Sequence, residues 1–441
     1  HYFVEPKSAI KVVVLGDIGR SPRMQYHSLS LANSGLDVNI IGYLDSTPMS
    51  EILQHPNIVI TKLQPFVVDH GPKLLQYVLK TIWQSISLFL TLIISGKCDY
   101  LMCQNPPAIP TLPVCRLYCL ISRSKFIIDW HNYAYTIMGL TMSAEHPMLK
   151  LATKMEKYFG QSSDNNLCVT YAMKNDLLQY WNVKATVLYD RPPKLFKSLS
   201  IQEKHDWYVK MSQEFPEFAS PGKDRLNLQA GDSAEDKTVF SCRVDGQVEL
   251  RGDRPGLLMS STSWTPDEDF SVLFEALQAY EISTSKLPKL LVVITGKGPL
   301  KSHYSEQIRL RRWKKIEVLM PWLESRDYPL MVGSADLGVC LHTSSSGLDL
   351  PMKVVDMFGA GLPVCAHDYQ CLDELVDNGT NGFVFKNSEE LSKQIIEWFH
   401  GFPNNSKQNK IQEKMREELG KFQESRWEDN WELRAKKFFE S

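Results

Sequence analysis

The chain has 441 residues, 43% of them hydrophobic and 23% charged, with a formal net charge of −2 at pH 7. This length exceeds a single ordinary hydrophobic core and predicts two domains of roughly 200 residues each. The near-neutral charge gives no electrostatic case for binding nucleic acid, and the apolar content excludes a disordered chain.

The nine cysteines are scattered along the chain and form no C-x-x-C pair. An odd, dispersed set within apolar runs is typical of reduced thiols in a protein core. The sequence therefore predicts neither a disulfide framework nor a zinc site.

The first half of the chain alternates strands and helices. Residues 10–15 predict a buried strand, residues 22–34 a helix and residues 37–43 a second strand, which is the start of a parallel sheet. Further strands are predicted at residues 58–63, 100–104, 125–129, 167–170 and 185–188. These elements predict one doubly wound domain over residues 1–192.

The longest apolar run covers residues 77–95 and includes Lys80 and Gln84. A bilayer span needs about 20 strongly apolar residues, so this run fits better as a buried or interfacial helix. Residues 73–95 and 114–121 are the candidates for membrane contact.

Residues 193–255 break the alternation. Charged stretches at residues 230–237 and 251–256 predict a linker with a variable, partly mobile insertion. A second alternation then predicts a further Rossmann-like domain over residues 256–400, with a cleft between the two domains. The charged, helical residues 401–441 are predicted to pack back towards the first domain.

One stretch of the second half, residues 341–366, predicts a diphosphate site. Asp349 is suited to the N-cap of a helix and Pro351 to its first turn, so that backbone N–H groups and Lys353 would meet an anion there. Asp356 lies on the same face as Lys353 and could accept the hydroxyls of a ribose. The alternative is an ordinary helix start with Lys353 and Asp356 as a surface ion pair.

Two loops of the first half end strands with polar groups. Residues 16–21 follow the first strand, but they lack the third glycine of a dinucleotide fingerprint. His131 follows another buried strand and could take a proton from an attacking hydroxyl. Asp129 and Asp17 are the rival bases, and a purely structural role for His131 is equally open.

Two loops of the second half have the same character. Residues 295–299 combine two glycines with Lys297, which favours close approach of backbone to a charged ligand. Trp322 could support a nucleotide base. Residues 267–269 superficially match a D-x-D metal signature, but their place before a helix favours an interaction with the helix dipole, and no metal site is predicted.

Long motifs of this chain resemble the GT-B glycosyltransferases and, more closely, the chitobiosyldiphosphodolichol β-mannosyltransferase family. They include GDIGRSPRMQYHSLSLA, QNPPAIP, IIDWHNYAYTIMGL, SSTSWTPDEDFSVL, VVITGKGPL and RWEDNW, and the resemblance runs from residue 10 to near the end except for residues 195–253. It implies an α/β fold of two Rossmann-like doubly wound domains facing across a cleft.

The resemblance also implies an activity, which is transfer of mannose from GDP-mannose to a dolichol-linked GlcNAc disaccharide during N-glycan assembly. GDP-mannose would be held by Ser263, Trp264, Gly296, Lys297, Trp322, Leu323, Ser344, Ser345, Gly347, Leu348, Lys353 and Asp356. The acceptor would meet Gly16, Gly19, Arg20 and Arg23, and the catalytic candidates are His131, Asp17, Asp129 and Lys353. No obligatory cofactor or metal is implied.

Members of this family carry an N-terminal anchor and act at the cytosolic face of the endoplasmic reticulum membrane, where other mannosyltransferases of the pathway are candidate partners. This chain begins just after the expected anchor. A β-mannoside made from an α-linked donor requires inversion. Leu348 stands at the first position of the E-x7-E motif of related families, so that motif gives no support to retention.

Two alternatives stay open at this point. One is a retaining α-mannosyltransferase that acts on a lipid-linked sugar. The other is a catalytically silent paralogue that holds a glycosylation complex together.

Overall fold

The computed structural model describes residues 8–66, 72–220 and 237–440. The chain divides into two compact units. The first unit comprises His1–Asp190, Ser344–Leu350 and Trp427–Ser441, and the second comprises Arg191–Thr343 and Pro351–Arg426.

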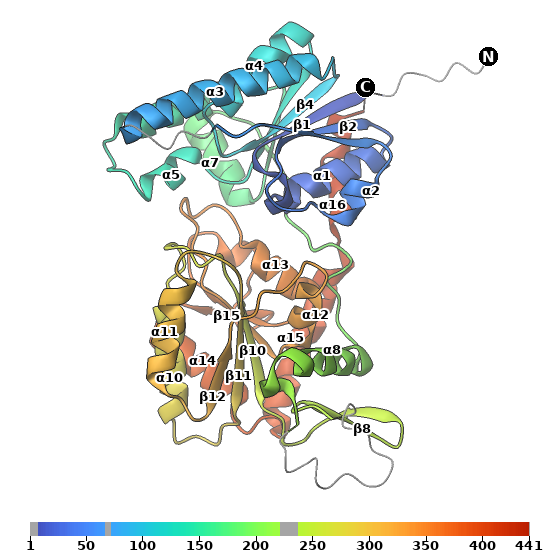
Figure 1. The fold of residues 1–441 in the computed structure, drawn as a ribbon, viewed down its shortest axis with the longest axis vertical. Helices are drawn as coiled ribbons and strands as arrows, with labels where there is room; N and C mark the ends of the chain where they lie inside the picture. The colour runs from blue at the N-terminus through green and yellow to red at the C-terminus, as the bar shows by residue number, and fades with distance from the viewer. Residues whose placement is uncertain (1–7, 67–71, 221–236, 441) are drawn as a thin grey trace, which may run out of the picture. The chain divides into compact units, whose positions relative to one another are not determined.

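The first unit contains a seven-stranded parallel sheet in the order β3-β2-β1-β4-β5-β6-β7 (Figure 1). Its strands are β1 (Ala9–Asp17), β2 (Asp37–Tyr43), β3 (Ile58–Lys62), β4 (Tyr100–Asn105), β5 (Lys125–Trp130), β6 (Asn165–Cys168) and β7 (Thr186–Val187). The interior residues of β1, β4 and β5 are buried, as expected of a sheet covered on both faces. All seven strands predicted for this half are confirmed, each within three residues of its predicted ends.

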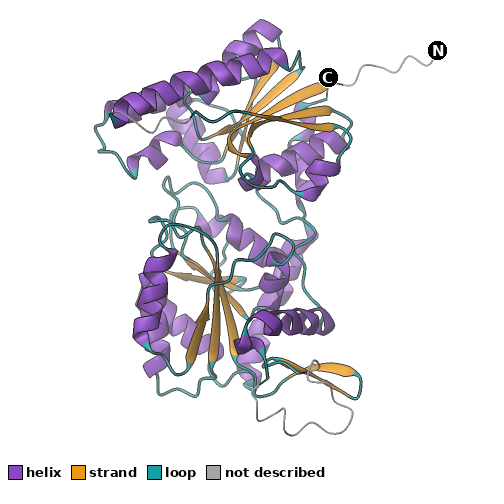
Figure 2. Ribbon diagram, viewed as in Figure 1, coloured by secondary structure: helices purple, strands orange, loops and turns teal. Residues whose placement is uncertain are grey.

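Helices cover this sheet (Figure 2). They are α1 (Pro22–Asn33), α2 (Ser50–Gln54), α3 (Lys73–Ile94), α4 (Thr111–Ser122), α5 (Ala134–Gly139), α6 (Pro147–Ser162), α7 (Tyr171–Trp181) and α16 (Trp427–Arg434), with short 3-10 turns η1 (Ile18–Arg20) and η5 (Lys436–Phe438). Helix α16 comes from the C-terminal end of the chain and packs against α1.

Helix α3 packs against α4 and leaves much of its apolar surface uncovered. Leu88 and Leu92 are buried, whereas Ile82, Ile86 and Leu90 are each about half exposed. Within the described residues, α3 alone is long and apolar enough to cross a membrane, and 11% of that window is buried. It is therefore an exposed apolar helix, not the core helix that was one of the two expectations for this run.

The second unit contains a six-stranded parallel sheet in the order β12-β11-β10-β13-β14-β15. Its strands are β10 (Gly256–Ser261), β11 (Leu290–Thr295), β12 (Ile316–Leu319), β13 (Leu337–Cys340), β14 (Val364–His367) and β15 (Gly382–Phe385). Its helices are α10 (Ser271–Ile282), α11 (Lys301–Arg311), α12 (Tyr328–Ser334), α13 (Met352–Gly359), α14 (Ser388–Phe399) and α15 (Ser406–Glu424), with the 3-10 turn η4 (Leu372–Glu374). This is the second doubly wound arrangement that the sequence predicts.

Residues 193–255 are more regular than predicted. They contain α8 (Ile201–Glu214), the 3-10 turn η2 (Pro216–Phe218) and an antiparallel hairpin of β8 (Ser241–Val244) and β9 (Gln247–Leu250), and all of them group with the second unit. Ser200 and Glu203 form a capping box at the start of α8. The predicted linker is therefore wrong for the described part of this region, which forms ordered elements of the second unit, while residues 221–236 of the predicted variable insertion lie outside the described residues.

The C-terminal tail is divided between the units. Helix α15 packs against α13 of the second unit, and residues from Trp427 onwards group with the first. The prediction that all of residues 401–441 return to the first domain is therefore wrong for 401–426. All nine cysteines are free thiols, and eight of them are buried, as expected of core residues.

Candidate active site

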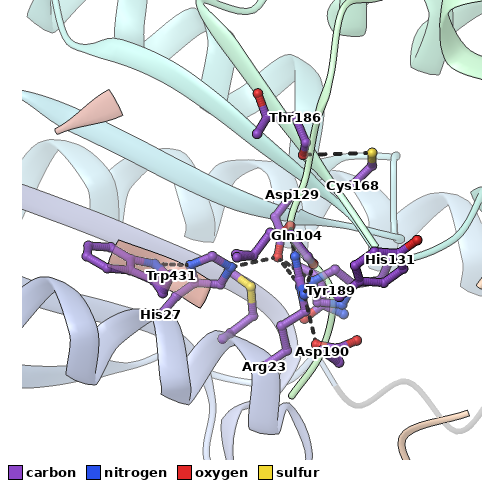
Figure 3. Close-up of polar contacts among 12 residues, drawn as sticks. Arg23, His27, Gln104, Asp129, His131, Cys168, Thr186, Tyr189, Asp190 and Trp431 are labelled. Atoms are coloured by element: carbon purple, nitrogen blue, oxygen red, sulfur yellow. Dashed lines mark hydrogen bonds and ion pairs between the residues drawn. The ribbon is translucent and has the colours of Figure 1, made fainter. Parts of the chain in front are cut away.

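The buried carboxylate of Asp129, near the end of β5, is the centre of a polar cluster in the first unit (Figure 3). Its Oδ1 accepts a hydrogen bond from Arg23 Nη2 at 2.8 Å. Its Oδ2 meets Arg23 Nε at 2.8 Å, His131 Nε2 at 2.7 Å and His27 Nε2 at 3.1 Å. Arg23, His27, Asp129 and His131 are called the Asp129 cluster below.

This environment decides the protonation state of Asp129. Burial by itself would raise the pKa of the carboxyl, but the neighbouring Arg23 guanidinium and the imidazoles of His131 and His27 outweigh it and hold the pKa well below its usual range. A carboxylate that is fully buried and so weakly basic is a poor proton acceptor. The suggestion that Asp129 is the base is therefore replaced by a role in orienting His131.

Arg23 was expected to contact the acceptor, and the structure gives it another role. The side chain is 4% exposed, and its Nη1 donates to Leu188 O at 2.9 Å and to Asp190 Oδ1 at 2.8 Å. Because Nε and Nη2 also donate to Asp129, all three nitrogens of the guanidinium have partners inside the protein. Arg23 holds Asp129 in place, and the expectation of direct acceptor contact is withdrawn.

His131 is the member of the cluster that reaches the surface, with 21% of its side chain exposed. Because Nε2 lies on the Asp129 carboxylate, it carries the proton and Nδ1 is the nitrogen that can accept another. A buried carboxylate that orients an imidazole and stabilises its charged form is a known arrangement for general base catalysis. The geometry favours His131 over the two carboxylates.

The loop at residues 16–21 is held by Asp17. Its Oδ1 accepts from the backbone N–H groups of Gly19 at 3.2 Å, Asp45 at 3.2 Å and Ser46 at 3.1 Å. Burial opposes the charged form of Asp17, but hydrogen bonds from Ser46, Asp45 and Gly19 outweigh it and lower the pKa. Asp17 therefore organises the loop, and its proposed role as a base is not supported by this geometry.

The other residues predicted on this loop differ in exposure. Arg20 extends into solvent with 79% of its side chain exposed, so it stays a candidate for acceptor contact together with Gly16. Gly19 is required for packing, because a Cβ there would lie 2.5 Å from Ser46 O.

The loop at residues 344–350 belongs to the first unit, although it follows a strand of the second. Asn132, the neighbour of His131, donates to Asp349 Oδ1 at 2.8 Å and to Ser345 Oγ at 3.2 Å. Leu348 is buried in the core of the first unit, and its carbonyl accepts from Thr170 Oγ1 at 2.6 Å. The prediction that the Leu348 side chain binds the donor is thus replaced by a packing role.

The predicted helix cap at Asp349 is also wrong. Helix α13 has its N-cap at Pro351 with no side-chain capping bond, and Asp349 instead accepts from Ser344 Oγ and Asn132. Within the loop, Gly347 has a φ of 75° and its N–H donates to Ser344 Oγ at 2.9 Å. An uncapped helix start keeps the anion-binding character on which the diphosphate prediction depends.

Lys353 in the first turn of α13 forms an ion pair with Glu268. Glu268 is 2% exposed and also accepts a 2.5 Å hydrogen bond from Thr262 Oγ1, whereas 26% of the Lys353 side chain is exposed. The expectation that residues 267–269 serve a helix dipole is therefore wrong for Glu268. Asp269 does interact with the start of α10, since its Oδ1 accepts a hydrogen bond from Ser271 N at 2.9 Å.

The glycine loop after β11 packs on the loop after β10. A Cβ on Gly296 would lie 1.8 Å from Thr262 O, and one on Gly298 would lie 1.7 Å from Ser263 O. The close backbone approach predicted for these glycines is thus made to Thr262 and Ser263. Trp264 is fully buried against Phe270 and Tyr304, so its ring is a core residue and the prediction that it meets the donor is wrong for the side chain.

Two other residues predicted to bind the donor lie together. The Lys297 ammonium lies 4.1 Å from the centre of the Trp322 ring, and Trp322 is 55% exposed. A cation over an exposed indole is a stable contact that a ligand could share.

Asp356 lies near the hydroxyl of Tyr328. Burial raises the pKa of this hydroxyl, and the negative charge of Asp356 raises it further. Donor contacts by Leu323, Ser263 and Asp356 stay predictions.

Sequence reasoning missed His27, Asn132, Thr170 and Glu268. Each acts on a partner more than 80 residues away, so no local spacing could reveal the pairing. Among the residues that the structure describes, no group of three or more His, Cys, Asp or Glu side chains could hold a metal ion.

Two doubly wound α/β units, each built on a parallel sheet, are the architecture of the GT-B glycosyltransferases. The model of the family Glycosyl transferases group 1 matches residues 251–418. A sucrose-phosphate synthase from Thermosynechococcus elongatus has the same fold, with a TM-score of 0.62 at 10% identity over 97% of this chain and 96% of that one.

Relatives with known names are much more similar in sequence. The chitobiosyldiphosphodolichol beta-mannosyltransferase of Mus musculus is 46% identical over 96% of this chain and 87% of its own length. A protein of Arabidopsis thaliana named UDP-glycosyltransferase TURAN is 42% identical over 89% of each chain. The chain belongs to the chitobiosyldiphosphodolichol beta-mannosyltransferase family.

Proposed function

We propose that this chain transfers mannose from GDP-mannose to chitobiosyldiphosphodolichol with inversion, forming the first, β-1,4-linked mannose of the lipid-linked oligosaccharide. The observation that carries the proposal is the Asp129 cluster, which presents one imidazole nitrogen of His131 to a ligand and fixes the other on a buried carboxylate. Family membership supplies the substrate class.

The proposed step is a single in-line displacement. The O4 hydroxyl of the acceptor attacks C1 of mannose and gives its proton to His131 Nδ1, while the bond from C1 to the phosphate oxygen breaks and its electron pair leaves with GDP. Asp129 stabilises the imidazolium that forms. Lys353 and the uncapped start of α13 stabilise the charge that grows on the leaving diphosphate.

The purified chain, labelled GDP-mannose and a phytanyl-linked GlcNAc disaccharide diphosphate test this proposal. The product should carry a β-mannosyl linkage by NMR, and turnover should persist in EDTA. UDP-glucose serves as the competing donor, because the Arabidopsis relative carries a UDP-glycosyltransferase name. An α-linked product, or preference for the UDP-sugar, contradicts the proposal.

His131→Ala tests the role of the base directly. We expect kcat to fall by about 10²–10⁴-fold at saturating acceptor, as loss of a general base typically requires. His400→Ala, which removes an exposed imidazole of the second unit, is the matched control and should leave kcat unchanged. A loss of less than about tenfold for His131→Ala excludes this histidine as the base.

We also propose that the cytosolic face of the endoplasmic reticulum membrane is where this chain works, with α3 and α4 as its lipid-facing surface. The exposed Ile82, Ile86 and Leu90 recur every four residues and form one apolar face. Residues 73–98 and 111–125 contain six Lys or Arg and no Asp or Glu, which suits anionic headgroups at the edge of such a face.

Flotation with phosphatidylcholine vesicles, with and without phosphatidylserine, tests this surface. The full chain should float, more strongly with the anionic lipid, and Ile86→Asp should abolish flotation. Leu310→Asp, which changes an exposed leucine of α11 in the second unit, is the control. Equal flotation of the two variants would show that lipids contact another part of the chain.

A further inference from the structure

The C-terminal helix α16 reaches the Asp129 cluster through one hydrogen bond. Trp431 is 2% exposed, and its Nε1 lies 3.0 Å from Nδ1 of the fully buried His27 (Figure 3). The other ring nitrogen of His27 lies 3.1 Å from Asp129 Oδ2. A continuous chain of hydrogen bonds therefore runs from Trp431 through His27 and Asp129 to His131.

The indole fixes the tautomer and the charge of His27. An indole N–H can only donate, so Nδ1 of His27 must be an unprotonated acceptor and its single proton lies on Nε2, pointing at Asp129. Burial also lowers the pKa of His27, in opposition to Asp129 and with help from the charges of Arg23 and His131. The ring is therefore neutral, and it donates to Asp129 without bringing a second cation.

The neutrality of His27 matters to His131. The Asp129 carboxylate is already paired with the Arg23 guanidinium. The same carboxylate must also stabilise the imidazolium of His131 that forms during the reaction. A protonated His27 would compete for the same oxygen atom, Oδ2, which both rings share. Helix α16 places the neutral rings of Trp427 and Trp431 against His27.

We propose that Trp431 is a positioning residue for the catalytic base, which it supports by holding His27 neutral and aimed at Asp129. This inference rests on the proposed role of His131 and assigns a function to the last helix of the chain, whose RWEDNW motif otherwise takes no part in the chemistry. The reaction would then depend on residues from the first 30 and the last 20 of the chain.

The chain offers a matched pair of variants. Trp431→Phe removes the indole N–H that meets His27, whereas Trp427→Phe removes the N–H that the same helix donates to Ser30 Oγ at 3.0 Å. Both replacements keep an aromatic ring in a buried position, so losses of packing are similar. Only the first variant interrupts the hydrogen-bond chain.

Trp431→Phe should lower kcat about tenfold and change the KM for the acceptor by less than about twofold, because removal of one charge-supporting hydrogen bond acts on the transition state. The acid limb of the kcat profile should become steeper, since His27 can then take up a proton at Nδ1 beside Arg23, Asp129 and His131. Trp427→Phe keeps an aromatic ring beside His27 and Arg23, so it should lower kcat less than Trp431→Phe does and leave the acid limb of the pH profile unchanged. His27→Gln should restore most of the activity that is lost in His27→Ala, because a neutral amide can accept from the indole and donate to Asp129.

A readout that does not depend on turnover separates this inference from the proposed function. In full-length protein labelled with ¹⁵N-histidine, His27 should appear as a neutral ring with its proton on Nε2 in the wild type and in Trp427→Phe, and should lose that signature in Trp431→Phe. If Trp431→Phe keeps the wild-type spectrum and pH profile, the inference is overturned even where His131→Ala is inactive. If His131→Ala is active while the His27 signature still depends on Trp431, it is the base assignment that fails.

Discussion

The Asp129 cluster of the first unit and the Glu268–Lys353 pair of the second each place a buried carboxylate against a cation at the end of a strand or helix. They differ in how many partners the charged groups have. Asp129 receives donors on both oxygens from three side chains, and all three nitrogens of Arg23 donate to Asp129, Asp190 or Leu188. Glu268 is equally buried, but Lys353 remains a quarter exposed with one acidic partner in its ion pair.

This difference in the number of partners indicates which chemical task each site can perform. A saturated cluster orients one imidazole and has little freedom to rearrange, which is suited to a group that moves a proton. An ammonium that is a quarter exposed and lies on a buried carboxylate keeps donor capacity for an incoming anion. The predictions below test this contrast, in order of decreasing effect.

Asp129→Asn breaks the cluster and should have the largest effect. We expect kcat to fall by about 10³-fold, because the amide cannot hold both His27 and His131 in their present tautomers. The free energy of unfolding, measured by urea denaturation, should fall by about 3 kcal/mol, because the buried guanidinium of Arg23 loses most of its countercharge. Wild-type kcat in a folded Asp129→Asn protein would show that the cluster is only structural.

Lys353→Ala breaks the pair and should act on donor binding. We expect GDP affinity by calorimetry to fall by about 10²-fold, which is the scale of a lost diphosphate contact. Lys393→Ala, which removes an exposed lysine of α14, is the control for net charge and should bind GDP normally.

A second control separates binding from the cost of a buried charge. In Lys353→Ala the carboxylate of Glu268 is left without its cation, which destabilises the unit by itself. The double variant Lys353→Met, Glu268→Gln removes both charges and should recover thermal stability without recovering GDP binding. Recovery of both would mean that Lys353 does not contact the diphosphate.

The last prediction concerns stability and not activity, in the loop that carries His131. Glu156 on α6 is fully buried, accepts from Ala134 N and from Asn105 Nδ2 at 2.7 Å each, and Asn105 O in turn accepts from His131 N at 2.9 Å. Burial raises the pKa of Glu156 from 4.5 to about 7, against the hydrogen bonds that it accepts.

Because the folded state binds this proton more tightly than the unfolded state, the stabilising contribution is complete below about pH 4.5 and is lost as the pH rises through 7. The loss amounts to about 3 kcal/mol at most. Glu156→Gln should remove this part of the pH dependence, which urea denaturation at pH 5 and pH 8 would detect. An unchanged pH dependence in the variant would assign the titration to another group.

Much of the fold could be read from local patterns, and the errors have identifiable causes. Buried parallel strands give continuous apolar runs, so the strands of the first sheet were located within a few residues. Helix α8 was missed because its charged, weakly patterned sequence resembles a linker, although Ser200 and Glu203 carry the capping-box spacing that would have revealed it. Asp349 was misassigned because a good capping residue can find a better partner elsewhere, here Asn132.

The sequence by itself determined the two doubly wound domains, the strand-end position of His131 and the helix-start position of Lys353, because these depend on periodicity and on residues close together in the chain. Only the tertiary structure decided which polar and charged side chains pair with each other. Arg23 and His27 meet Asp129 across 106 and 102 positions of sequence, Trp431 meets His27 across 404, and Glu268 meets Lys353 across 85. Such pairings follow from how the strand ends and helices pack in three dimensions, and no local spacing encodes them.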